Sequence, residues 1–150
     1  MMQEELKFNL KSALEGLVLD SREEIADRDA ELKIWVFARK DLPMTLGKFG
    51  GQAAHAGGTC MVISDRKNNS VVDQYLSQGQ PKIVVAVENE AELVKCVQLC
   101  HSEMLVSVLV QDAGRTELQG KTLTIGAVGP CLRSDLPKAV RRLQMFKQPV

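Results

Sequence analysis

With 150 residues the chain is long enough for one domain with a buried core, and its apolar (45%) and charged (25%) fractions are those of ordinary globular proteins. It has no stretch near the roughly 20 apolar residues of a membrane span and no basic start followed by an apolar run, so we expect a cytoplasmic protein. The formal net charge is zero, so overall charge gives no attraction for nucleic acid.

The charges are distributed unevenly along the chain. Residues 1–31 carry a balance of −5, and residues 32–150 carry a balance of +5. The segment 138–147 contains bases but no acid, and two of the bases are Arg141 and Arg142. A moderately basic body can hold phosphates, although a solvated helix face is the commoner reason for such a run.

The four cysteines show no CxxC pairing, and in a reducing compartment an even number does not imply disulfides. Cys96, Cys100 and His101 have a spacing that would place metal ligands on one helical face. The same face continues through apolar side chains, so we interpret these cysteines as core residues and expect no metal and no cofactor. Those apolar side chains are Leu93, Val97 and Met104.

Leucines at near-helical spacing predict one or two amphipathic helices within residues 3–31. No glycine-proline linker separates this segment from the rest. We therefore expect an acidic helical extension over residues 1–31, attached to one domain over residues 32–150.

From residue 33 onward the predicted elements alternate between strands and helices. Pro43 restricts the residue before it and predicts a loop at 41–44, after which Thr45 is a suitable N-cap. Strands separated by helices indicate parallel crossovers, so the expected class is α/β, with a four-stranded mixed sheet flanked by helices. The predicted strands cover 33–39, 82–87, 104–111 and 122–128, and the predicted helices cover 46–63, a short segment before Ser77, 88–100 and 135–146, the last capped by Ser134.

The helix at 46–63 carries the first candidate site. Lys48, Gln52 and His55 are spaced so that they share one helical face, which would present a cation, an amide and an imidazole together. Gly50 and Gly51 cost this helix about 1 kcal/mol each relative to alanine, which suggests close approach by another element or by a ligand. Two interpretations stay open, a polar site or tight helix packing with a solvated Lys48.

The loop after the strand at 104–111 carries the second candidate site. Asp112, Arg115 and Thr116 place a carboxylate, a guanidinium and a hydroxyl at the carboxyl end of a strand, where open α/β sheets bind ligands. An Asp-Gly turn that has only a structural role is an equally good interpretation. On the following strand, the period of two places Thr122, Thr124 and Gly126 on one face, and Gly129-Pro130 predicts a turn.

Taken together, these segments resemble the type 2 peptidyl-tRNA hydrolases over about residues 33–147. That family has a strand ending in Arg-x-Asp-Leu-x-Met, then GKxAAQxxHA, GQxKVVV, QDAGRT, a threonine-containing strand and a Gly-Pro turn. The corresponding residues of this chain are Arg39 to Met44, GKFGGQAAHA at 47–56, GQPKIVV at 79–85 and an intact QDAGRT at 111–116. Gly50-Gly51 replaces the usual alanine pair, which removes no chemical group.

The resemblance implies a catalytic set and a substrate. It places Lys48, Asp112, Thr116 and Thr124 in the reaction, with Gln52, His55 and Arg115 as neighbours. It also implies a cytosolic homodimer without a metal, which hydrolyses the ester bond of peptidyl-tRNA.

The same comparison suggests a mechanism. We expect the crossover topology to bring Lys48 and Asp112 to one edge of the sheet, where Asp112 would orient or deprotonate a water. Lys48 would keep Asp112 ionised and, with Thr116 or Thr124, would stabilise the charge that develops on the ester carbonyl oxygen. The candidates for phosphate contacts are Arg115, Lys121, Arg141 and Arg142.

Two alternatives from other classes remain open. The first is a catalytically inert tRNA- or RNA-binding module, although the intact set of Lys48, Asp112 and Thr116 argues against a pure binder. The second is an interaction protein whose residues 1–31 dock a partner on a scaffold domain.

Overall fold

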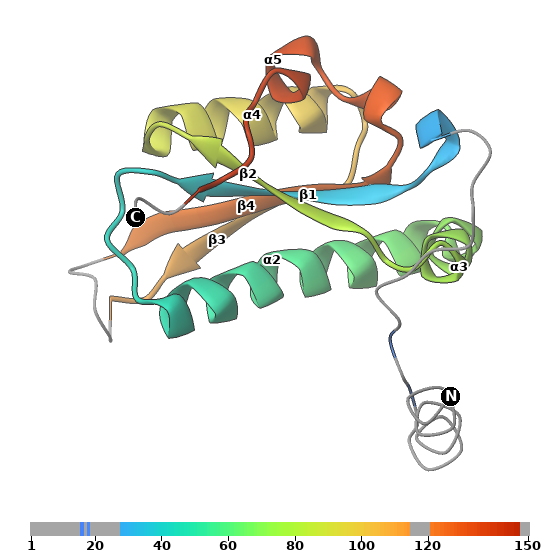
Figure 1. Cartoon of the computed structure of the whole chain (residues 1–150), viewed down its shortest axis with the longest axis horizontal. Coiled ribbons are helices and arrows are strands. Elements are labelled where there is room, and N and C mark those ends of the chain that lie inside the picture. Colours follow the sequence, from blue (N-terminus) through green and yellow to red (C-terminus); the bar gives the residue numbers. More distant parts are fainter. Residues whose placement is uncertain (1–15, 17, 19–27, 115–120, 148–150) are drawn as a thin grey trace, which may run out of the picture.

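A four-stranded mixed sheet in the order β2-β1-β4-β3 organises the computed structural model, which describes residues 16, 18, 28–114 and 121–147 (Figure 1). β1 pairs parallel with β2, and β4 pairs antiparallel with both β1 and β3. β1, β2 and β3 therefore run in the same direction, and their carboxyl ends meet at one edge. The strands are β1 (Lys33–Arg39), β2 (Lys82–Val87), β3 (Ser107–Asp112) and β4 (Thr122–Cys131).

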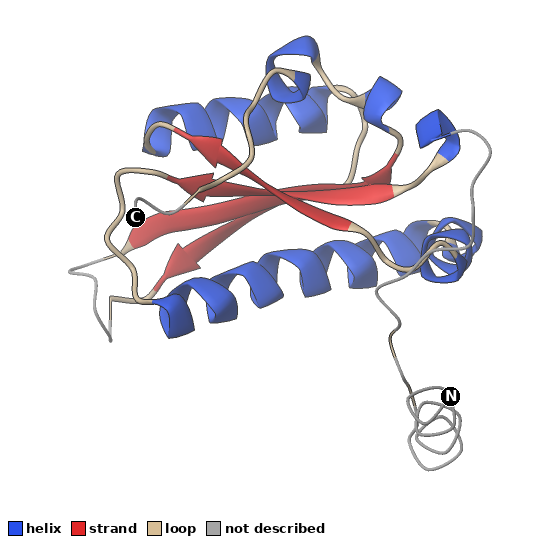
Figure 2. Cartoon of the chain, in the orientation of Figure 1, coloured by secondary structure: helices blue, strands red, loops and turns tan. Residues whose placement is uncertain are grey.

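Helices cover both faces of this sheet (Figure 2). α2 (Leu46–Lys67) and α3 (Asn69–Ser77) lie on one face, and α4 (Glu90–Ser102) and α5 (Lys138–Arg141) lie on the other (Figure 1). This layering confirms the α/β class and the mixed four-stranded sheet. No helix of the described residues is long and apolar enough to cross a membrane.

Two apolar clusters fill the space between the sheet and its helices. The period of two along β1 sends Trp35 and Phe37 towards α4 and α5, and sends Ile34 and Val36 towards α2 and α3. The cysteines at positions 96 and 100 are buried in the first cluster, with free thiols. The interpretation of these cysteines as core residues is therefore confirmed.

β4 contains a bulge close to its start. Val110 of β3 pairs with Ile125, and the next residue, Gln111, pairs with Leu123. Thr124 is therefore an extra residue on β4 without a counterpart on β3, and such a residue changes the face to which side chains point.

The bulge corrects the prediction that Thr122, Thr124 and Gly126 share one face. Thr124 faces α2, where its hydroxyl meets Gln52. Gly126 faces α4, where a Cβ atom would lie 2.7 Å from a methyl group of Val97. The period of two holds only while the strand pairing stays in register, and Thr124 breaks that register.

The predicted last helix over residues 135–146, capped by Ser134, is wrong. A single 3-10 turn, η2 (Arg133–Asp135), is followed by the four-residue helix α5. Pro137 interrupts the helix because it disfavours helical geometry in the residue before it, and Leu136 has the extended angles φ −70° and ψ 142°.

After α5 the chain returns to the free edge of β2. The amide of Ala86 donates to the carbonyl of Gln144 at 2.8 Å, and the amide of Phe146 donates to the carbonyl of Val84 at 2.9 Å. These bonds satisfy backbone groups that an edge strand would otherwise expose.

Two shorter predictions also need correction. Gly129-Pro130 lies within β4 and is not a turn before a helix. Gly129 has φ +119°, and a Cβ there would meet the carbonyl oxygen of Lys33 at 2.5 Å, so a side chain does not fit. The strand predicted from residue 104 begins at Ser107, because Met104, with φ 64°, ends the turn that follows α4.

Of the predicted helical extension over residues 1–31, the structure describes Gly16, Val18 and residues 28–31. Arg28–Ala30 form one 3-10 turn, η1, and the rest lies outside the described residues. The side chain of Gln78 accepts from the amide of Leu32 at 2.8 Å and donates to the carbonyl of Ala30 at 3.3 Å. Gln78 therefore holds the start of the domain against the end of α3.

Two glycines provide a matched test of this packing. We expect Gly126→Ala to lower the free energy of unfolding by about 1–3 kcal/mol, because the new methyl group would overlap Val97 and crowd the carbonyl of Val108 at 3.1 Å. Gly50→Ala should raise it by about 1 kcal/mol, because a Cβ at Gly50 meets no atom within 4 Å. Denaturant unfolding measures both, and equal effects of the two variants would contradict the packing of β4 against α4.

Candidate active site

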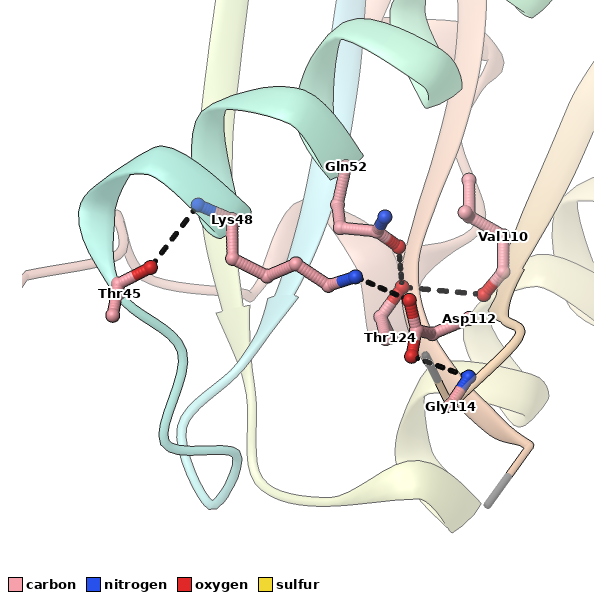
Figure 3. Close-up of polar contacts among 7 residues, drawn as sticks. All are labelled: Thr45, Lys48, Gln52, Val110, Asp112, Gly114 and Thr124. Carbon is pink, nitrogen blue, oxygen red and sulfur yellow. Dashed lines mark hydrogen bonds and ion pairs between the residues drawn. The ribbon is translucent and has the colours of Figure 1, made fainter. Parts of the chain in front are cut away.

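The start of α2 directs a lysine towards the end of β3. Thr45 caps the helix, because its side-chain oxygen accepts from the amide of Lys48 at 3.3 Å. From this turn the Lys48 ammonium reaches the Asp112 carboxylate and forms an ion pair with it (Figure 3). The expected meeting of these two side chains at one edge of the sheet is therefore confirmed.

The ion pair is largely removed from solvent. The side chains of Lys48 and Asp112 are 13% and 7% exposed. Opposite charges attract more strongly in such a setting than on an open surface, and salt screens them less. The site therefore holds a fixed cation and a fixed anion side by side.

Asp112 is the last residue of β3, and its second carboxylate oxygen accepts from the amide of Gly114 at 2.8 Å. The hydrogen bond from Lys48, followed by this amide, holds the pKa of the Asp112 carboxyl below its usual value, although burial acts in the opposite direction. Asp112 is therefore a carboxylate at neutral pH. The sequence left open whether Asp112 forms a structural Asp-Gly turn or belongs to a polar cluster. In the structure Asp112 does both, because one carboxylate oxygen accepts from Gly114 and the other pairs with Lys48.

A second polar contact lies beside the ion pair (Figure 3). The Thr124 hydroxyl donates to the side-chain oxygen of Gln52 at 2.5 Å, and the carbonyl of Val110 lies 3.3 Å from the same hydroxyl. Thr124 is fully buried and Gln52 is 7% exposed. Since Gln52 is one turn beyond Lys48 on α2, this contact fixes the helix against β4 next to the ion pair.

Arg39, at the end of β1, holds the same edge of the sheet together, a role that sequence reasoning missed. Its guanidinium donates two hydrogen bonds of 2.9 Å to the carboxylate of Asp41 and one of 2.7 Å to the carbonyl of Leu123. Leu123 directly precedes Thr124, so Arg39 fixes the backbone beside the bulge. The signal that could have identified it was its place, with Asp41, in the Arg-x-Asp-Leu-x-Met pattern.

Comparisons with known proteins identify the family. A family model described as Peptidyl-tRNA hydrolase PTH2 matches residues 32–146. The chain belongs to this family. A peptidyl-tRNA hydrolase of Methanocaldococcus jannaschii is 37% identical over 115 residues, which cover 77% of this chain and 100% of the archaeal protein. Proteins of the same name from Thermoplasma acidophilum and Pyrobaculum aerophilum are each 34% identical, over 76% and 78% of this chain and 97% and 99% of their own lengths.

The structure brings together four of the residues that the family resemblance selects. Lys48, Gln52, Asp112 and Thr124 converge from α2, β3 and β4 (Figure 3). Thr116 and Arg115 lie outside the described residues.

The other selected residues lie apart from this cluster. His55 is exposed on α2, almost one turn beyond Gln52, and Lys121 is exposed directly before β4. Arg141 and Arg142 lie at the end of α5, on the face of the sheet opposite α2. In the described part of the chain, no group of three or more histidine, cysteine or acidic side chains could hold a metal ion.

The sequence left two interpretations open for α2, a polar site or tight helix packing with a solvated Lys48. The surroundings of its glycines and of Lys48 decide between them. A Cβ at Gly50 or Gly51 would meet no atom within 4 Å, and Lys48 is not solvated but paired. The interpretation of tight helix packing with a solvated lysine is therefore wrong for the described residues. The polar site is the interpretation that the geometry supports.

The hydroxyl of Thr124 provides a test of this arrangement. We expect Thr124→Val to lower the free energy of unfolding by about 1–3 kcal/mol, because it leaves the buried oxygen of Gln52 without its donor while keeping the side-chain shape. Thr124→Ser keeps the hydroxyl and is the matched control, with a smaller loss. Chemical denaturation of both variants measures the difference, and a valine variant as stable as the wild type would contradict the assigned contact.

Proposed function

We propose that this chain hydrolyses the ester bond between the peptide and the tRNA of peptidyl-tRNA, releasing free peptide and free tRNA. The observation that carries the proposal is the partly buried Lys48–Asp112 pair, formed in a chain that belongs to the Peptidyl-tRNA hydrolase PTH2 family. An ester hydrolase needs a group that handles the attacking water and a group that stabilises the oxyanion. The pair supplies one of each.

Lys48 stabilises the charge that forms on the ester. Water attacks the carbonyl carbon, and the carbonyl electron pair moves onto the oxygen, where the Lys48 ammonium meets the developing negative charge. The ammonium is already held in place by α2 and is 13% exposed, so little reorganisation accompanies the reaction. A preorganised donor of this kind contributes about 10²–10³-fold to the rate.

Asp112 orients the attacking water and accepts its proton. In the resting state the Lys48 bond keeps the pKa of this carboxyl low, so Asp112 is a weak base. As negative charge develops on the oxyanion, the ammonium stays in place and shares its three N–H donors between that oxygen and Asp112, so its bond to the carboxylate weakens and Asp112 becomes a stronger proton acceptor. Collapse of the intermediate then breaks the bond to the ribose oxygen, which leaves with the proton that Asp112 took from water.

The neighbouring polar residues complete the proposed site. Thr124 acts through Gln52, because its hydroxyl hydrogen is donated to that amide and its side chain is fully buried. Thr116 is the second proposed hydroxyl donor, a role that rests on the resemblance to the family. The candidates for contacts with the tRNA or the peptide are His55, Arg115, Lys121, Arg141 and Arg142.

Two further properties belong to the proposal. The resemblance to the family favours a homodimer, and light scattering against the 16.5 kDa mass of one chain measures it. A role in recycling tRNA from aborted translation places the protein in the cytoplasm, and cell fractionation tests this.

A single-turnover assay with N-acetyl-aminoacyl-tRNA at low salt tests the reaction. We expect the wild type to release the acetylated amino acid, and Asp112→Asn and Lys48→Met each to slow release by about 10²–10³-fold. Lys95→Met is the matched control, because Lys95 is exposed on α4, away from the site, and should keep the wild-type rate. All variants are first checked for folding, since each active-site change leaves one buried partner unpaired.

The same assay separates the alternatives. A wild type that binds tRNA in a salt-dependent manner without releasing the amino acid would establish the inert binding module and refute the hydrolase. A Lys48→Met variant with the wild-type rate would remove the ion pair from the mechanism. Loss of function only on deletion of residues 1–31 would favour the interaction protein.

The pH dependence follows from the lowered pKa of Asp112. A carboxyl whose folded pKa lies below its unfolded value, about 3.9, is ionised throughout the neutral range and loses its contribution only as the pH falls through the folded value. We therefore expect the single-turnover rate to vary by less than about threefold between pH 5 and pH 8. If the single-turnover rate instead falls as the pH is lowered, with a midpoint between pH 6 and 7 where imidazoles ordinarily titrate, the proton transfer is assigned to a histidine.

A further inference from the structure

A mostly apolar cavity of about 400 Å³ opens beside the start of α2. Volumes of this size are typical of small-ligand sites. Its apolar walls come from the loop that follows β1, from the first turn of α2 and from the returning C-terminal segment. These side chains are Leu42, Met44, Leu46, Phe49 and Phe146.

The cavity has a fixed wall and an open rim. The rings of Phe49 and Phe146 stack with centroids 5.3 Å apart and planes inclined by 16°. Phe146 is held there by the hydrogen bond of its amide to the carbonyl of Val84 in β2. Leu46 also lines the cavity and is 72% exposed, so it lies where the cavity opens to solvent.

The cavity adjoins the proposed catalytic centre. Phe49 directly follows Lys48 on α2, so one helical turn presents the ammonium to Asp112 and a ring to the cavity. Arg39 lines the cavity and also bonds the carbonyl of Leu123, next to Thr124. The cavity and the Lys48–Asp112 pair therefore flank the same helical turn, on neighbouring sides of α2.

The charges around the cavity are already paired. Arg39 makes an ion pair with Asp41 at 2.9 Å, and Lys40 makes one with Glu88 at 2.9 Å. Both cations that line the cavity therefore carry a carboxylate partner, and a phosphate would have to compete with it. The lining suits an uncharged, apolar group better than a nucleotide of the tRNA end, which brings its phosphate with it.

We propose that this cavity binds the side chain of the peptide residue that is esterified to the tRNA, and that it favours large apolar side chains over small ones. The inference rests on the proposed function, and it goes beyond it by naming the part of the substrate that this chain distinguishes. The tRNA body then lies on the other side of the ester, outside the cavity.

Non-hydrolysable analogues test the inference without needing catalysis. One tRNA is charged at its 3′ end, through an amide in place of the ester, with N-acetyl-leucine or with N-acetyl-glycine. We expect the wild type to bind the leucyl analogue roughly 10-fold more tightly, as is ordinary for a missing apolar group in a fitted pocket. Leu46→Glu should reduce this ratio to about one, since it places a charge at the rim.

The control is Val62→Glu, which introduces the same charge at a side chain that is 51% exposed on the same helix, and which should keep the wild-type ratio. Leu46 is more exposed still, so its variant is expected to fold. Because the ratio is taken within each variant, any general repulsion of the tRNA phosphates by the new carboxylate cancels.

Two results would each overturn the inference. They are equal binding of the two analogues by the wild type and an unchanged ratio in Leu46→Glu. If the wild type shows no preference and Leu46→Glu weakens the binding of both analogues equally, the cavity is assigned to the tRNA end instead. If the chain distinguishes the two amide analogues but cleaves neither of the corresponding esters, the assignment of the cavity stands and the proposed hydrolase activity is refuted.

Discussion

The ion pair between Lys48 and Asp112 is the interaction on which the arrangement of this edge of the sheet depends. A lysine in the first turn of a helix faces the positive end of the helix dipole, and the first turn of α2 contains no acidic residue to offset it. Asp112 supplies that offset from another element, but only because β1 and β3 run in the same direction and end at one edge. Removing either charge would leave the other buried and unpaired, so each residue requires its partner to stay in place.

The elements that build this edge could be predicted from the sequence, because local patterns specify them. The strand at β1 reads as a run of apolar residues, and the threonine before α2 reads as an N-cap, so both begin where the sequence indicated. The bulge at Thr124 could not be read in this way. Which residue is left over in an antiparallel pair depends on the register of two strands and not on the pattern of either. The period of two therefore gave Thr124 the wrong neighbours, and it was the resemblance to the family that proposed Thr124 as a site residue.

The C-terminal segment illustrates a competition that the sequence does not reveal. Ser134 as an N-cap favoured a helix over 135–146, yet β2 is an edge strand whose backbone groups need partners. Pairing with Gln144 and Phe146 satisfies those groups, and Pro137 already disfavours a long helix. The outcome also matters for the site, because only the extended return of the chain brings Phe146 against Phe49.

The first turns of α2 thus serve two chemically different surroundings. Successive residues of a helix point about 100° apart, so Lys48 and Phe49 cannot face the same side. One reaches the carboxylate at the end of β3, and the other closes an apolar cavity with the C-terminal segment. A rotation of this helix that improved one contact would spoil the other. Three contacts therefore restrict the rotation of α2 about its axis: the cap by Thr45, the hydrogen bond between Thr124 and Gln52, and the stacked rings of Phe49 and Phe146. Together they fix the positions of the Lys48 charge and of the apolar cavity relative to each other.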